Sequence, residues 1–505
     1  MDGTTKDQSG QSGLELGREP AGVLEALGAW ATGTGPLHRR LARALRSAIE
    51  RGDLPPGLRL PPERTLARSL SLSRSTVVAA YDLLEQDGLL DRRQGSGTRI
   101  RDRRGEPSSA AGPALARALS RNTLFRRIAD GPDGTIDFLG AYLLGSELPA
   151  SVLVDLDREL AQLSHGAGYA PLGYPPLRQA IAVHLTRAGL RTAPEQVLVT
   201  SGAQQAIHLA GWLVLHPGDT AVVENPTYPG ALDALSAVGG RLAWVPTGRQ
   251  GANLEVLSEL VTRVVPRLLY LIPTFQNPTG GLMPEHRRRA VARLVEAHQL
   301  PLVEDQSLAE LNLREEPVPP PIAAFAPEAP ILTVGSLSKL FWGGLRVGWI
   351  RAATPQITQL GRLKAVADLG GSLPSQVIAT RLLEQFEVVR QERCAELARR
   401  FALMSELLQH HLPAWSWESP LGGLCLWVRL PYGTAPEFAQ VALRHGVSVV
   451  AGPVASADNG FSEYLRLPFG LEPSAIEEGV RRLARAWQAY VPLMEPERQA
   501  LTVIV

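Results

Sequence analysis

Apolar and polar positions alternate with two different periods in residues 36–100, and the change of period separates helices from strands. Leu or Ile recurs every fourth position from Leu37 to Ile49, which predicts an amphipathic helix that ends at Gly52. A second, short helix is expected after the Pro-Pro pair at 61–62. The last residues of the stretch, LLDRRQGSGTRI, predict two short strands around a Gly-Ser-Gly turn.

A third helix is predicted over RSTVVAAYDLLEQDG, where apolar residues recur every three or four positions. Ser73 precedes this run and carries the hydroxyl needed to cap its first turn, and Gly88 ends it. Residues 36–100 therefore read as helix, helix, turn, helix and then a two-stranded wing.

Residues 134–492 have a different pattern, in which apolar strand-like runs alternate with amphipathic stretches. The runs are QVLVT, TAVVE, RLLYLIP, LPLVED and ILTVGS. This order predicts an α/β fold, with helices on both faces of a mainly parallel sheet and a ligand site at the carboxyl ends of its strands. From about residue 375 we expect a smaller α+β subdomain.

Three segments lack such patterns. Residues 1–35 begin with a polar, Gly/Ser-rich stretch and are expected to form a disordered tail. Residues 101–133 mix Pro, Gly, Ser and Arg and are interpreted as a linker between domains. Residues 493–505 are expected to form a C-terminal tail.

Composition agrees with a soluble, cytoplasmic protein. Hydrophobic residues make up 45% of the 505 positions, yet no apolar run is long enough to cross a bilayer. The N-terminus lacks the pattern of a secretory signal. Cys394 and Cys425 are too few for a metal cluster or a disulfide framework, although a single disulfide between them stays open.

Charge is unevenly distributed. Residues 36–100 contain 12 Arg, no Lys and 7 acidic residues, a net charge of +5, so the remaining chain sums to −4 because the total is +1. A local positive field suits a polyanion such as double-stranded DNA. A solvated charged face, or a three-helix domain that binds protein, stays open as the alternative.

The third helix of residues 36–100 has the side chains of a DNA-recognition tip. Short hydroxyls and one long cation at a helix start can contact base edges, and cations nearby can hold phosphates. The tip is Ser73, Arg74, Ser75 and Thr76. The candidate phosphate contacts are Arg64, Arg92 and Arg93, and Gly95 and Gly97 let the wing approach the DNA backbone.

Lys339 is one of only three lysines among 51 cationic residues, with Lys6 and Lys364. A lysine, unlike an arginine, can lose its proton and attack a carbonyl, so a Schiff base requires one. Taken alone, Lys339 is equally well read as a solvated charge. Hydroxyl and guanidinium groups that suit a phosphate dianion flank it, namely Ser336, Ser338 and Arg346.

Further candidates follow the predicted strands. Small residues at a strand-to-helix turn free backbone amides for a phosphate, an aromatic face can cover a ring, and a carboxylate can pair with a ring nitrogen. The residues so placed are Ser201, Gly202, Ala203, Gln204, Tyr228, Asn277, Glu304 and Asp305. Each has a simpler reading as core packing, turn chemistry or a helix cap. Together with Lys339 they predict pyridoxal 5'-phosphate as the cofactor.

The stretch 36–100 resembles the winged helix-turn-helix of the GntR family in its segments LPPERTLA, SRSTV, AYDLLEQDGLL and GSGT. The resemblance implies DNA contacts by Arg64, Arg74, Ser75, Thr76 and the wing near Gly95. Val78 stands where some members carry another DNA-contacting arginine, so one contact is missing.

Residues from about 135 to 490 resemble the fold-type I aminotransferases, with SGAQQ, NPTYPG, QNPTG, VED and SLSK followed by GLRVGW in family order. The resemblance makes Lys339 the Schiff-base lysine and Asp305 the partner of the pyridinium nitrogen. Tyr228 then stacks on the ring and Asn277 meets its phenolate oxygen. The implied phosphate ligands are Ala203, Gln204, Ser336 and Arg346.

The same resemblance assigns two more roles and contains one departure. Tyr169 would reach the phosphate of the other subunit in a dimer, and Arg466 would pair with the α-carboxylate of a substrate. The family usually has a tyrosine two or three residues after Asp305, where this chain has Ser307 and Leu308. A donor to the phenolate is thus lost or shortened.

A GntR-like winged helix joined to such a domain resembles the MocR/GabR regulators. The resemblance implies a head-to-tail homodimeric transcriptional regulator, which senses an amino acid or amine through an aldimine at Lys339. An active aminotransferase with an accessory DNA-binding domain is the alternative, supported by the NPTG motif and Arg466. A cofactor fold that serves only as an inert dimeriser is a third reading, against which the intact Lys339 set argues.

Overall fold

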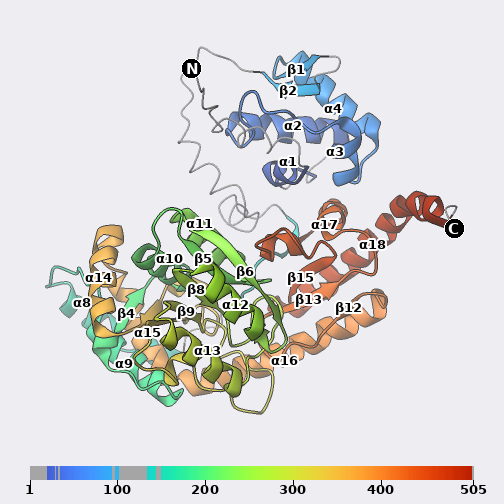
Figure 1. Ribbon diagram of the computed structural model, residues 1–505. Coiled ribbons are helices and arrows are strands. Elements are labelled where there is room, and N and C mark those ends of the chain that lie inside the picture. Colours follow the sequence, from blue (N-terminus) through green and yellow to red (C-terminus); the bar gives the residue numbers. More distant parts are fainter. Residues whose placement is uncertain are drawn as a thin grey trace, which may run out of the picture. The chain divides into compact units, whose positions relative to one another are not determined.

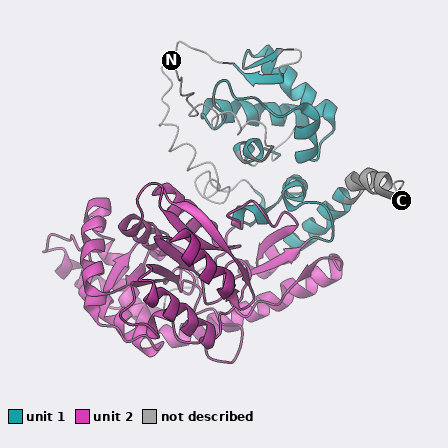
Figure 2. Ribbon diagram, viewed as in Figure 1, with its two compact units in different colours: residues 1–139, 430–454, 478–505 teal, residues 140–429, 455–477 magenta. Residues whose placement is uncertain are grey.

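The structure is a computed structural model that describes residues 20–28, 30–31, 35–93, 97–101, 134–143 and 149–502, with side chains up to 490 (Figure 1). The chain forms two compact units (Figure 2). Unit 1 comprises residues 1–139, 430–454 and 478–505, and unit 2 comprises residues 140–429 and 455–477. Most of the predicted linker lies outside the described residues.

Unit 1 contains the predicted winged helix. Its helices are α2 (Leu37–Glu50), α3 (Glu63–Ser69) and α4 (Arg74–Gln86), and its wing is the antiparallel pair β1 (Leu90–Arg93) and β2 (Gly97–Ile100). The apolar faces of the helices meet in one core where Leu41, Leu66 and Tyr81 are fully buried. Each such side chain contributes about 1.5–3 kcal/mol by leaving water, so this core stabilises the three short helices.

One segment of the expected N-terminal tail is helical instead. Helix α1 (Pro20–Leu27) packs Val23 and Leu27 into the core of the winged helix, and Trp30 is buried there too. The prediction of a tail over residues 1–35 is therefore wrong for this part. A helix of eight residues, about two turns, supplies too few positions for its period to stand out beside Gly-rich flanks.

The rest of unit 1 combines residues 134–139 with two segments from the C-terminal part of the chain. It contains α17 (Ala435–Arg444) and the parallel strands β3 (Ile136–Phe138) and β14 (Val447–Ala451). Helix α18 (Pro473–Thr502) runs through most of the range in which we expected a C-terminal tail. None of the described helices is long and apolar enough to span a membrane.

Unit 2 is built on an eight-stranded sheet with the order β4-β11-β10-β9-β8-β5-β6-β7. Strands β11 and β7 run against their neighbours and the others are parallel, as predicted. The bounds are β4 Val197–Thr200, β5 Thr220–Asn225, β6 Arg241–Gly248, β7 Gly251–Ala252, β8 Leu268–Leu271, β9 Leu302–Asp305, β10 Ile331–Ser336 and β11 Gly348–Arg351.

Helices cover both faces of this sheet (Figure 1). Leu268 and Tyr270 of β8 pack with α10, α11 and α14, whereas Leu269 and Leu271 pack with α12 and α13. Burial on both faces explains why the strands read as continuous apolar runs. The helices between residues 150 and 411 are α7 Ala150–Leu153, α8 Leu156–Leu163, α9 Pro175–Arg187, α10 Ala203–Val214, α11 Pro229–Ala237, α12 Leu254–Val264, α13 Glu285–Ala297, α14 Thr354–Asp368, α15 Leu373–Glu384 and α16 Phe386–His411.

The smaller subdomain contributes three antiparallel strands to unit 2, which are β12 (Ser416–Trp417), β13 (Cys425–Arg429) and β15 (Tyr464–Pro468). Arg466 of β15 lies opposite Trp427 of β13. Directly opposed residues project to the same face, so the side chain of Arg466 shares a face with Cys425 and Trp427.

Candidate cofactor site and nucleic-acid interface

The carboxyl ends of five strands bring most of the candidate residues together at one edge of the large sheet. These strands are β4, β5, β8, β9 and β10, which share one direction. In chain order the residues are Ser201 to Gln204 after β4, Tyr228 after β5, Asn277 after β8, Asp305 at the end of β9, and Ser336, Ser338 and Lys339 at or after the end of β10. Charges on Asp305, Arg346 and Arg466 all act on Lys339, so they lie close to it.

Among the residues that the structure describes, Lys339 has no carboxylate hydrogen-bond partner. Its Nζ donates to the carbonyl oxygen of Ala141 at 2.6 Å. Loss of hydration in the protein interior lowers its pKa from 10.5 to about 8, with Cys425 and Asp305 opposing the shift and Arg466 adding to it. A substantial share of this amine is therefore neutral near pH 8, as a nucleophile must be.

Asp305 is the buried carboxylate of the site. It is 4% exposed, and it accepts hydrogen bonds from the Tyr270 hydroxyl at 2.7 Å and from the Ser307 amide at 2.8 Å. Glu304 serves a different purpose, because it accepts from the amides of Ile322 and Ala323 at the start of η2 (Ile322–Ala324). The helix-cap reading thus applies to Glu304, whereas Asp305 belongs to the site.

Tyr270 was not singled out from the sequence. Its run, RLLYLIP, reads as a buried strand, and the one signal is a hydroxyl among aliphatic residues. Burial and the neighbouring Asp305 raise the pKa of Tyr270 well above its ordinary value, so it stays a hydrogen-bond donor. Burial, with Asp305 nearby, also raises the pKa of Tyr228 to about 12 and that of Glu224 to about 8.

The turn between β4 and α10 has the backbone expected of a phosphate-binding loop. Gly202 has φ 121°, a conformation that side chains disfavour, and a Cβ there would lie 3.2 Å from Nη2 of Arg346. Arg346 therefore reaches the turn from η3 (Gly343–Leu345), where it is the C-cap. The side chain of Gln204 donates to the carbonyl of Gly230 at 2.8 Å, so its backbone amide is the group left for a phosphate.

Several buried polar atoms of the site lack a hydrogen-bond partner among the described residues. They include Oδ1 of Asn277, Oγ of Ser307 and Oγ of Ser338. Asn277 also lines a small hollow, together with Ala141, Leu308 and Cys425. Buried polar groups normally have partners, so these atoms mark where a polar ligand fits.

Arg466 and Tyr169 differ in their placement. Arg466 is 1% exposed and its charge acts on Lys339 and Tyr228, so it belongs to the site. Tyr169 precedes α9 and is 71% exposed, and it has no side-chain contact with the site within the described part of one chain.

The recognition tip at the start of α4 is exposed in unit 1. Ser73 caps the helix by accepting from the Thr76 amide at 3.2 Å, and Arg64, Arg74 and Ser75 face solvent. Arg92, in contrast, pairs with Asp82 at 2.6 Å and lies over the Tyr81 ring, so it is held on α4 rather than free for a phosphate. Gly95 and the side chain of Arg93 lie outside the described residues.

Comparison with known proteins identifies both regions. The aminotransferase class I and II model matches residues 139–483, and the model of the gntR family of bacterial regulatory proteins matches residues 37–100. The chain is 32% identical to the probable rhizopine catabolism regulatory protein MocR of Rhizobium meliloti, with 75% of this chain and 78% of that protein covered. This chain belongs to the MocR-type transcriptional regulators.

Two further relatives agree with the MocR-type assignment. The helix-turn-helix-type transcriptional regulator YisV of Bacillus subtilis is 31% identical, with 78% of this chain and 84% of that protein covered. The crystal structure of LysN, an α-aminoadipate aminotransferase from Thermus thermophilus in complex with N-(5'-phosphopyridoxyl)-L-leucine, matches with TM-score 0.70 and 32% identity, covering 77% of this chain and all (100%) of that one.

These matches confirm the predicted fold, a winged helix joined to a fold-type I domain, and the predicted cofactor. The aminotransferase class I and II fold implies pyridoxal 5'-phosphate in this MocR-type regulator, and the gntR match implies DNA binding. The unpartnered hydroxyl of Ser338, the amine of Lys339 and the turn at Gly202 fit such a cofactor.

Proposed function

We propose that this regulator senses an amino acid or amine in the site around Lys339 and passes the occupancy of that site to its winged helix. The observation that carries the proposal is the amine of Lys339, whose pKa is lowered to about 8. The same chain also carries an exposed recognition tip at the start of α4. The cofactor, when bound, supplies an aldehyde and an electron-withdrawing ring.

Each residue of the site has a proposed task toward the cofactor. Lys339 holds it covalently, Asp305 keeps its ring nitrogen protonated, Tyr228 covers the ring and Asn277 contacts the phenolate oxygen. Arg466 binds the carboxylate of the incoming amino compound. The proposed phosphate ligands are the amides of Gly202, Ala203 and Gln204 with Ser336, Ser338 and Arg346.

The proposed DNA contacts and the dimer complete the assignment. Arg74, Ser75 and Thr76 read base edges from a helix start capped by Ser73, and Arg64 and the wing at Gly95 hold phosphates. Tyr169 is available to a second copy of this chain because it is exposed, which supports the head-to-tail homodimer. A ligand can shift such a dimer only if it binds two of its states with different affinity.

An active aminotransferase is the second candidate. Asn277 and Arg466 support it, as does 36% identity to the 2-aminoadipate transaminase of Thermus thermophilus, with 72% of this chain and 92% of that protein covered. Against it, Ser307 and Leu308 replace the tyrosine donor, and Leu308 is buried beside the hollow.

A titration separates the two candidates. The purified protein is loaded with pyridoxal 5'-phosphate and mixed with a panel of amino acids while absorbance and keto acid are followed. A sensor gives a shifted band that persists without keto acid, together with changed affinity for operator DNA. Stoichiometric keto acid with unchanged DNA affinity would instead establish the enzyme.

A further inference from the structure

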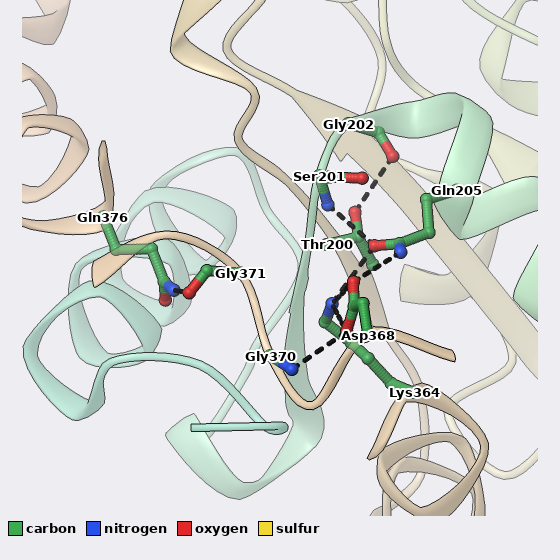
Figure 3. Close-up of polar contacts among 9 residues, drawn as sticks. All are labelled: Thr200, Ser201, Gly202, Gln205, Lys364, Asp368, Gly370, Gly371 and Gln376. Atoms are coloured by element: carbon green, nitrogen blue, oxygen red, sulfur yellow. Dashed lines mark hydrogen bonds and ion pairs between the residues drawn. The ribbon is translucent and has the colours of Figure 1, made fainter. Parts of the chain in front are cut away.

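Lys364 is a buried lysine, and it lies beside the turn between β4 and α10. Its side chain is 1% exposed. As Figure 3 shows, its Nζ meets Asp368 and Gln205, with donor–acceptor distances of 2.8 Å and 2.6 Å to the two carboxylate oxygens and 3.2 Å to Oε1 of Gln205. Neither the family assignment nor the proposed cofactor contacts use this cluster.

The number of acceptors explains why this position holds a lysine in a chain that otherwise relies on arginine. An ammonium has three donors and meets three acceptor atoms here. A guanidinium has five donors in a rigid fork and would leave some of them buried without partners. The cluster is therefore built for a compact point charge.

Gln205 connects this ion pair to the turn. Its Oε1 accepts from the amide of Ser201 at 2.8 Å as well as from Lys364, and its Nε2 donates to Asp368 at 2.8 Å. The opposite amide orientation would set Nε2 against two donors, so the ion pair fixes the orientation of Gln205. In turn, Gln205 fixes the first residue of the turn that contains Gly202 (Figure 3).

The other side of the cluster reaches the segment that carries Tyr169. Asp368 accepts from the amide of Gly370 at 2.9 Å. Gly370 has φ 125°, and a Cβ there would lie 2.8 Å from the carbonyl oxygen of Ala170. The backbone at Gly370 therefore packs closely against Ala170, the residue that follows Tyr169.

We propose that Lys364, Asp368 and Gln205 form a positioning network that holds the β4–α10 turn in the conformation that binds the cofactor phosphate. By accepting the Ser201 amide, Gln205 fixes the turn so that the amides of Ala203 and Gln204, at the start of α10, point to the phosphate. This inference rests on the proposed cofactor contacts and adds residues that act on the phosphate through the turn.

The test compares two probes that differ only in the phosphate. Affinities for pyridoxal 5'-phosphate and for pyridoxal are measured by absorbance titration of the full-length protein without cofactor. We expect Lys364→Met and Gln205→Leu to reduce the preference for the phosphorylated probe roughly tenfold, the scale on which lost outer-sphere hydrogen bonds act at ligand sites. Gln205→Leu retains the ion pair between Lys364 and Asp368. This variant therefore tests the proposal even if Lys364→Met does not fold.

Arg288→Met is the matched control. Arg288 is a buried cation whose guanidinium donates to Met283, Pro273 and Thr274, away from the turn. Its loss should lower stability without changing the ratio of the two affinities. Equal weakening of both probes in Lys364→Met and Gln205→Leu would overturn the positioning role. If the wild type binds neither probe, the proposed cofactor contacts fail instead.

Discussion

Lys339 and Lys364 both lie in unit 2, but they are held in opposite ways. Lys364 has three acceptors, two of them on a carboxylate, and matches them with three donors. Within the described part of the chain, Lys339 has one carbonyl acceptor, and its pKa is lowered to about 8. A cation with matched acceptors fixes structure, whereas one that lacks them can lose its proton and react.

The strongest test of this contrast is replacement of Lys339. Lys339→Ala should abolish the visible band of the bound cofactor, because no amine then remains to hold it covalently. Lys339→Arg is the matched variant: it preserves the charge and should lose the band as well. A band retained in either variant would show that another group holds the cofactor.

The pH dependence of cofactor loading is the next largest effect. The pKa of Lys339 is lowered from 10.5 to about 8, so the neutral amine increases about tenfold per pH unit below pH 8. The loading rate, followed by stopped-flow absorbance, should rise accordingly and level off above pH 8. A rate that continues to rise toward pH 10.5 would mean that the interior does not lower the pKa.

Removal of Lys364 should also lower the stability of the protein. Lys364→Met leaves Asp368 without its cation, and because Asp368 is 29% exposed we expect a loss of about 1–3 kcal/mol in the free energy of unfolding in urea. The control is Arg289→Met, in the exposed pair with Glu285, which should cost under about 0.5 kcal/mol. Equal costs in both variants would contradict the structural role of Lys364.

The direct contacts to DNA are expected at the tip of α4, and neither lysine makes one. Arg74→Ala removes a contact at the recognition helix and should weaken operator binding by about 1–3 kcal/mol, measured at fixed salt by fluorescence anisotropy. The cofactor band should remain, since Arg74 lies in unit 1 and Lys339 in unit 2. Loss of the cofactor band in Arg74→Ala would contradict the assignment of DNA binding to unit 1 and cofactor binding to unit 2.

The smallest effect concerns Tyr270. Tyr270→Phe removes the donor at 2.7 Å from Asp305 and should weaken cofactor affinity by about 0.5–1.5 kcal/mol in an equilibrium titration. The matched variant Tyr432→Phe, in unit 1, should leave the affinity unchanged. An unaltered cofactor affinity in Tyr270→Phe would show that the Tyr270 hydroxyl does not help Asp305 to bind the cofactor.

The sequence predicted what depends on local pattern. The period of Leu37 to Ile49 gave α2, and Ser73 marked the start of α4 with its cap. The parallel strands were readable because they are buried on both faces, so residues such as Asp305 could be expected at their carboxyl ends.

What the sequence did not give depends on contacts between distant positions. Gln205 and Lys364 are separated by 159 positions, and no local pattern joins them. Tyr270 reads as one more apolar strand residue until the structure sets its hydroxyl against Asp305. Lys364 was visible as a rare lysine, yet the three acceptors that define its role appear only in the structure.

One measurement decides between the two lysines directly. Wild-type protein loaded with pyridoxal 5'-phosphate is reduced with borohydride, which fixes the cofactor to the amine that holds it, and its peptides are mapped by mass spectrometry. We predict the label on the peptide that contains Lys339 and none on the peptide that contains Lys364. Label on Lys364, or no labelled peptide at all, would contradict the account.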